Sequence, residues 1–170
     1  MIADIVMNGI LRLDGFLFDK SDRCPFCGGE LKAHDTKKKK FATVVEGDSR
    51  RNISVNVKRF RCTECGKLVY SDSPFYENIR MGAPLVDFCL LNLRIHPANH
   101  ISKILKKMNI IVNPSTIRSF SGLEPGNTPA IDFHEVRFPL SLLNISEAVM
   151  KEEGSERDNM LLYMLQKRNR

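Results

Sequence analysis

The chain has 170 residues, of which 42% are hydrophobic and 27% are charged, a balance typical of a water-soluble protein of one to three small domains. No stretch reaches the roughly 18 to 20 apolar residues that a membrane-spanning helix needs, which excludes a membrane protein. The net charge of +6 is concentrated in residues 20–67, with 13 Lys/Arg against 6 Asp/Glu, which fits either a polyanionic partner or a solvated charged surface.

The first segment, residues 1–19, is expected to form a helix near residues 2–12 followed by an extended stretch. Apolar residues recur with helical spacing from Ile2 to Ile10, whereas residues 16–18 form a short apolar run. The start of the chain shows neither a basic n-region nor a cleavage site of small residues, so we expect no signal peptide.

Two cysteine pairs follow, in Cys24-Pro-Phe-Cys27-Gly-Gly and Cys62-Thr-Glu-Cys65-Gly-Lys. A Cys-x-x-Cys lets two thiolates bind one ion, and the glycine after it allows a turn in which backbone N–H groups face sulfur. Two pairs complete a tetrahedral shell that has no open position for catalysis. We therefore predict that Cys24, Cys27, Cys62 and Cys65 hold one structural Zn²⁺ ion, and iron in the same geometry is the main alternative.

Other interpretations of these cysteines are weaker. A disulfide framework requires an oxidising compartment, and a redox Cys-x-x-Cys has no need of a second copy with its own glycine. Cys89 lies in an apolar run and is expected to be a small buried hydrophobe. His34 could replace one cysteine as a ligand, but a site with four thiolates needs no fifth.

Residues 20–73 as a whole are expected to form a zinc ribbon with an extended β-hairpin. Residues 40–45 and 53–60 are rich in β-branched side chains, residues 46–49 have the composition of a turn, and residues 67–70 would add a third strand. Because 34 residues separate the two cysteine pairs, we expect the hairpin to project beyond the metal site. Its face carries a lysine run, Lys37 to Lys40, and several arginines.

Residues 74–122 have a helical character. The segment 83–94 is apolar around most of its circumference, as a buried helix would be, and has a proline at its start. Residues 97–99 are expected to interrupt the chain before the next helix.

The next two predicted helices lie close together along the chain. Residues 101–108 place apolar side chains on one face and lysines on the other. After the connector 109–112, Asn113 is expected to cap a short helix that Pro114 opens and that runs to Phe120. Two helices joined by a tight connector are typical of a helix-turn-helix.

The last segment, residues 123–170, is predicted to be a linker and a helical tail, with helices near 140–150 and 157–166. Its apolar side chains exceed what a solvated tail would expose. We expect the tail either to pack back on the core, against the N-terminal helix, or to pair two chains in a homodimer. Asp132 and Glu135 are interpreted as loop or strand-edge charges.

Three stretches resemble the N-terminal half of archaeal insertion-sequence transposases: Arg59-Phe-Arg-Cys-Thr-Glu-Cys-Gly-Lys67, Asp72-Ser-Pro-Phe75 and Asn113-Pro-Ser-Thr-Ile-Arg118. In that family an aromatic and basic strand runs into the second zinc knuckle, and a helix-turn-helix ends in a Ser-Pro-Ser-Thr-Ile-type start of its recognition helix. The resemblance covers about residues 22–120. It implies that the four cysteines bind zinc and that Ser115, Thr116 and Arg118 face DNA, while Asn113 stands where the family usually has Ser.

Those transposases continue into an RNase H-like domain with an Asp-Asp-Glu triad that binds two Mg²⁺ ions. Only 50 residues follow Phe120 here, and they hold no such carboxylate cluster. We therefore expect no enzymatic activity. The chain is similar to the DNA-binding half of a transposase with another tail, either a domesticated regulator or an accessory protein of a mobile element.

The predicted fold class is α+β, with a small zinc-ribbon β domain, a helix-turn-helix domain and a helical C-terminal tail. The predicted function is zinc-dependent binding of double-stranded DNA for transcription regulation or for recognition of element ends, in the cytoplasm at the nucleoid. The alternative is a protein-interaction or RNA-binding adaptor of the transcription machinery, with RNA polymerase or RNA as its partner. The predicted DNA contacts are Ser115, Thr116, Arg118, Ser119, Lys103, Lys106, Lys107, Arg50, Arg51, Lys58 and Arg59.

Overall fold

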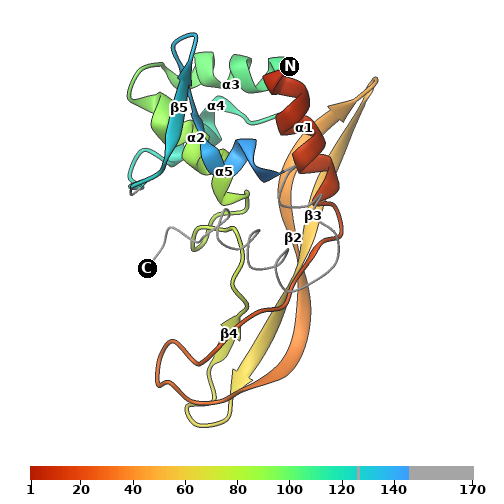
Figure 1. The fold of residues 1–170 in the computed structure, drawn as a ribbon, viewed down its shortest axis with the longest axis vertical. Coiled ribbons are helices and arrows are strands. Elements are labelled where there is room, and N and C mark those ends of the chain that lie inside the picture. Colours follow the sequence, from red (N-terminus) through yellow and green to blue (C-terminus); the bar gives the residue numbers. More distant parts are fainter. Residues whose placement is uncertain (126, 146–170) are drawn as a thin grey trace.

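A long β-hairpin runs through the computed structural model, which describes residues 1–125 and 127–145 (Figure 1). Its strands, β2 (Leu31–Glu46) and β3 (Ser49–Cys62), pair antiparallel along their whole length. The 16 residues of β2 correspond to about 50 Å of extended chain. The helices gather around the turn end of the hairpin, whereas the cysteine pairs lie at its open end.

The hairpin is longer than predicted on its first strand. Gly47 opens the two-residue turn with φ +60, which suits a type II′ turn and leaves the strands in the twist that hairpins favour. The polar residues 31–39 were not expected to be a strand. They pair with β3 nevertheless, with Lys37 opposite Val57 and Lys39 opposite Val55. Pairing with a β-branched partner strand therefore outweighs the low strand propensity of a lysine run.

Two short strands complete the sheet on the far edge of β3. β1 (Leu17–Phe18) runs parallel to β3, and β4 (Leu68–Tyr70) runs antiparallel to it. The predicted third strand is thereby confirmed as β4. The predicted N-terminal helix is confirmed as α1 (Ile2–Arg12), which has Val6 and Ile10 fully buried.

Three helices follow: α2 (Ala83–Leu93), α3 (Ala98–Lys107) and α4 (Pro114–Ser119). Nearly every residue of α2 is buried, as predicted from its apolar circumference. α3 begins three residues earlier than predicted, because Pro97 occupies the N-cap position, where its missing N–H breaks no helical hydrogen bond.

Asn113 stands at the N-cap of α4, as predicted, but its side chain makes no capping hydrogen bond within the described chain. The expectation that this amide caps the helix is therefore wrong. Its backbone carbonyl still accepts the first helical hydrogen bond, from the N–H of Ile117 at 3.1 Å.

The connector between α3 and α4 is fastened to the edge of β2. Ile110 and Val44 form an antiparallel bridge, and both side chains are fully buried. The N–H of Val45 donates to the carbonyl of Asn109, and the N–H of Ile111 donates to the carbonyl of Thr43, both at 2.9 Å. The two helices are therefore positioned by backbone hydrogen bonds to the hairpin.

The start of the tail is a second hairpin, which the sequence did not reveal. β5 (Ala130–Phe133) and β6 (Val136–Pro139) are joined by His134 and Glu135, with φ of 46 and 63. Two positive φ values are the mark of a type I′ turn, usually signalled by Asn-Gly, and neither residue is typical there. Asp132 accepts a 2.9 Å hydrogen bond from Arg137 across this hairpin, which confirms it as a strand-edge charge.

A short helix, α5 (Leu140–Leu143), follows and contacts α1 and α2. Leu142 and Ile145 are fully buried, so the tail packs back against the N-terminal helix up to residue 145, as one of the two alternatives predicted. The remainder of the predicted helix 140–150 and all of 157–166 lie outside the described residues. The homodimer stays a prediction.

The predicted α+β class is confirmed, since a sheet and several helices share one core. Buried side chains of α1, β2, β3, α2, α3, α4 and α5 belong to this core, and a second, smaller cluster surrounds Cys24 and Cys62. Among the residues that the structure describes, no helix is long and apolar enough to cross a membrane.

Candidate metal centre and nucleic-acid surface

The four predicted ligands converge at the open end of the hairpin. The Sγ atoms of Cys24, Cys27, Cys62 and Cys65 all lie within 4.8 Å of one another. Cys24 and Cys65 are 3.7 Å apart, and Cys27 and Cys62 are 3.4 Å apart. A tetrahedral shell with metal–sulfur bonds of about 2.3 Å separates the sulfurs by about 3.8 Å. The donor set and its spacing therefore fit one metal ion.

Each cysteine pair lies in a turn, here called a knuckle, and the two knuckles (residues 24–29 and 62–67) share one backbone pattern. In each, the N–H four residues after the first cysteine donates to that cysteine's carbonyl, at 2.9 and 3.1 Å. The cysteine's own N–H donates five residues ahead, at 3.0 and 2.9 Å. Gly28 and Gly66 adopt φ of +74 and +72, which is the left-handed conformation that glycine allows at little cost. The predicted role of these glycines is confirmed.

Gly29 has a role that the sequence analysis missed. A Cβ atom at this position would lie 3.0 Å from the Sγ of Cys62 and 2.9 Å from the side chain of Glu64. The absence of a side chain thus lets the first knuckle approach the second closely enough for the four sulfurs to meet. Only the distance between knuckles reveals this requirement.

The thiols of the cluster differ in pKa. The backbone N–H groups of Cys65 and Glu64 face Cys62 and lower its pKa to about 7. The N–H of Gly29 favours the Cys27 thiolate, but the hydrogen bond with Cys62 and partial desolvation outweigh it and raise its pKa to about 12. A bound cation would be needed for all four to be thiolates together.

The remaining cysteine and histidine predictions are also settled by position. Cys89 is fully buried in α2, which confirms it as a small buried hydrophobe, and burial raises the pKa of its thiol to about 12. His34 is exposed on β2. In the part of the chain that the structure describes, the four cysteines are the one group of potential ligands that converges in this way.

Seven predicted DNA contacts lie on α3 and α4, whose exposed side chains are here called the α3–α4 surface. All seven side chains are exposed, whereas Ile101, Leu105 and Ile117 are fully buried beneath them. The hydroxyl of Ser119 donates to the carbonyl of Thr116 at 2.6 Å, so it is engaged within its own helix. The seven are Ser115, Thr116, Arg118, Ser119, Lys103, Lys106 and Lys107.

The segment that contains α3 and α4 carries basic side chains but no acidic ones. Residues 88–123 contain five Lys/Arg and no Asp or Glu. The α3–α4 surface therefore has no acidic side chain of its own segment to offset its lysines. α4 has six residues and spans about 9 Å, so it presents few side chains to a partner.

Two of the four predicted contacts on the hairpin are occupied by carboxylates. Arg51 donates to Asp14 at 2.7 Å and to Glu46 at 2.8 Å, and Arg59 forms a two-pronged ion pair with Asp35. Lys58 lies 5.7 Å from the centre of the Phe60 ring, and Arg50 is exposed. The arginine pairs therefore fasten strands and the N-terminal segment, which reduces the charge that the hairpin offers to a polyanion.

Comparison with known proteins adds one match. Residues 24–71 match the family model described as Domain of unknown function (DUF6431), which covers less than a third of the chain. The matched segment begins at the first cysteine of the four-cysteine cluster and ends just after β4, so it contains both knuckles and the hairpin. No curated protein and no solved structure gives a significant match.

Proposed function

We propose that this chain is a zinc-dependent protein that binds double-stranded DNA, a transposase-derived transcription regulator or a factor that recognises the ends of a mobile element. The observation that carries the proposal is the α3–α4 surface. Its exposed side chains include three lysines, one arginine and three hydroxyl-bearing residues, and the buried residues of α3 and α4 belong to the core that they share with the hairpin. Hydroxyls and lysines bind phosphate, and arginine reads guanine.

Zinc is the metal that best suits the cysteine cluster. Four thiolates in a closed tetrahedron favour zinc or an iron centre over magnesium or calcium, which prefer oxygen ligands. A closed shell leaves no position for substrate, so we assign the ion a structural role. It would hold the two knuckles together and thereby keep the open end of the hairpin from separating.

In this proposal α3 and α4 act as a helix-turn-helix, with α4 as the recognition helix. Arg118 would contact base edges, while Lys103, Lys106 and Lys107 would contact backbone phosphates. The bridge between Ile110 and Val44 supports such a role, because it fixes the orientation of the helix pair against a rigid strand. A rigid mount reduces the entropy that binding would otherwise cost.

The experiment is selection of bound duplexes from a random pool by the full-length, zinc-loaded protein, followed by a salt titration on the selected site. Four to eight phosphate contacts would give a slope of log K against log salt of about −4 to −7. A flat salt response, or tighter binding to an RNA hairpin of the same length, would instead favour the RNA-binding or protein-interaction adaptor.

A further inference from the structure

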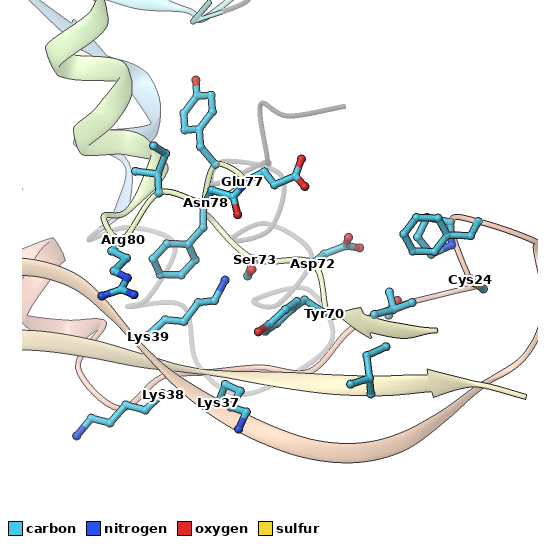
Figure 2. Close-up of a pocket in the computed structure, with 18 of the residues that line it drawn as sticks. Cys24, Lys37, Lys38, Lys39, Tyr70, Asp72, Ser73, Glu77, Asn78 and Arg80 are labelled. Atoms are coloured by element: carbon cyan, nitrogen blue, oxygen red, sulfur yellow. The ribbon is translucent and has the colours of Figure 1, made fainter. Parts of the chain in front are cut away.

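A deep cleft lies between the hairpin and the segment that leads from β4 into α2 (Figure 2). Its volume is about 1390 Å³, and its walls are residues 37–40 of β2 on one side and residues 72–80 on the other. The first knuckle and β4 line the end near the metal centre. The cleft shares no residue with the α3–α4 surface.

Two lysine–aromatic pairs stand at this cleft. The ammonium group of Lys39 lies 4.4 Å from the centre of the Tyr70 ring, and that of Lys67 lies 4.2 Å from the centre of the Phe26 ring. Both rings line the cleft, yet Tyr70 is 39% exposed and Phe26 is 61% exposed. In each pair the ammonium group lies over the ring, and the exposed remainder of the ring offers a flat apolar surface next to a positive charge.

The cleft is also basic, and its walls contribute cations from both sides. Six Lys/Arg and three Asp/Glu line it. Figure 2 shows Lys39 crossing from the hairpin toward the segment that carries Ser73 and Asn78, while Arg80 comes from that opposite wall and Lys38 points away. An anion in the cleft would therefore meet positive charge from two elements.

The buried hydroxyl of Ser73 is an independent indication that the cleft binds a polar ligand. Ser73 is 3% exposed and lines the cleft, and its Oγ atom has no hydrogen-bond partner among the described residues. A buried hydroxyl without a partner costs about 1 to 3 kcal/mol in a folded protein. A ligand with polar groups would satisfy it.

We propose that this cleft binds an unpaired nucleotide, with its base on the exposed part of the Tyr70 ring and its phosphate near Lys39 and Arg80. Single-stranded nucleic acids are bound by this combination of a basic groove and exposed aromatic rings, because every base offers a flat face for stacking. A base inside a duplex has both faces covered by its stacked neighbours, so an unpaired base is the form that can lie on a ring within a cleft. An acidic peptide would use the cations but would make no use of the exposed ring surface.

The proposal goes beyond duplex binding at the α3–α4 surface, and the two can fail separately. The test uses the full-length, zinc-loaded protein and fluorescence anisotropy. The probes are a blunt DNA hairpin, the same hairpin with a five-nucleotide thymidine overhang, and a thymidine hexamer. We expect the overhang to strengthen binding roughly 5- to 100-fold over the blunt hairpin.

Variants locate the effect in the cleft. Tyr70→Ser is expected to abolish the advantage of the overhang and to leave affinity for the blunt hairpin unchanged, whereas Tyr70→Phe keeps the ring and the advantage. Arg80→Gln, at an exposed position of the opposite wall, is expected to weaken binding of the hexamer several-fold. This second variant keeps the proposal testable if Tyr70→Ser fails to fold. Thermal melts of all three proteins check the fold.

The outcomes decide the proposal. Equal affinity for the blunt and overhang hairpins, equal loss for both probes in Tyr70→Ser, or competition by polyglutamate as strong as by the hexamer would each overturn it. Competition by thymidine monophosphate would identify a free nucleotide as the occupant, and binding of the hexamer alone would identify a strand. Hexamer binding without any hairpin binding would support the cleft and contradict the proposed duplex function.

Discussion

Val44 of β2 and Ile110, between α3 and α4, form an antiparallel bridge although 66 positions separate them in the chain, and neither side chain is exposed. The bridge places the helix pair at the turn end of the hairpin, far along β2 from the cysteine cluster. Any surface formed by α3 and α4 is therefore held in a fixed orientation to the sheet.

Ile110→Ala tests the contribution of this contact. The side chain is fully buried in the shared core, so its truncation should lower the free energy of unfolding by about 2 to 5 kcal/mol. Urea denaturation measures the change. Ile95→Ala is the matched control, because Ile95 is 52% exposed and should change stability by less than about 0.5 kcal/mol. Equal effects of the two changes would mean that the connector is not packed as described.

Gly82→Ala tests the approach of the segment before α2 to the hairpin. A Cβ atom at Gly82 would lie 2.2 Å from the ring of Phe41, which is fully buried and cannot move aside. We expect a loss of about 1 to 3 kcal/mol from overpacking. In Gly122→Ala the new methyl group meets no described atom within 4 Å, so thermal denaturation should show little change. A stable Gly82→Ala protein would contradict the contact with Phe41.

One zinc ion per chain is expected from the cysteine cluster. Protein purified without chelator should contain it by mass spectrometry under native conditions, and Cys62→Ser should lose it together with hydrogen-exchange protection in residues 62–67. Cys89→Ala is the control, because Cys89 lies in α2 away from the cluster and its loss should leave the metal content at one. Metal-free wild-type protein with an intact ribbon would refute the assignment.

The ion pair between Arg59 and Asp35 predicts a pH dependence. The hydrogen bonds from Arg59 hold the pKa of Asp35 at about 2, below its usual value of 3.8. A depressed carboxyl pKa adds stability above pH 4, and this contribution disappears as the pH falls toward 2. The difference in unfolding free energy between wild type and Asp35→Asn should therefore shrink from pH 5 to pH 3.

The comparison with Asp35→Asn cancels the acid sensitivity of the cysteine cluster, which both proteins share. Arg59→Gln provides a second check, since the pKa of Asp35 should return toward 3.8 when the guanidinium is removed. A difference that grows on acidification would contradict the pair.

Arg118→Ala and the double change of Lys106 and Lys107 to Ala separate two kinds of DNA contact. Loss of a guanidinium that binds guanine should cost about 1 to 3 kcal/mol on the preferred site and less on other sequences. Loss of the two lysines should weaken all sequences alike and reduce the salt slope by about 2. Uniform loss in both variants would place the recognition helix elsewhere. Arg137→Ala, on β6, is the control for charge alone.

The cysteine cluster and the main elements could be predicted because their signals are local. Ligand spacing, the glycine after each cysteine pair, and the apolar circumference of α2 are all visible within a dozen residues. The ion pairs of Arg51 with Asp14 and of Arg59 with Asp35 are not local, because 37 and 24 positions separate the partners and only the folded chain brings them together. Sequence analysis therefore placed Arg51 and Arg59 among the DNA contacts without their carboxylate partners, and these contacts stay predictions.

The cleft could not be predicted for the same reason. Lys39 belongs to a lysine run that the sequence places on the face of a hairpin, and only the register of β2 with β3, and of β3 with β4, brings its ammonium group over the Tyr70 ring. The second hairpin was missed because His134 and Glu135 adopt a turn conformation that their residue types do not signal.

The parallel pairing of β1 with β3 constrains the order in which this protein can fold. Leu17 and Phe18 find their partners, Asn56 and Val57, almost forty positions later, and the carbonyl of Phe16 also waits for the N–H of Asn56. Contacts between distant positions slow folding, because the intervening loop must close before they form. During synthesis on the ribosome, β1 therefore has no pairing strand until β3 has emerged. The first knuckle lies in the loop between β1 and β3 that must close. The chain that follows α1 is therefore fixed in place by β3, a strand that is synthesised after both.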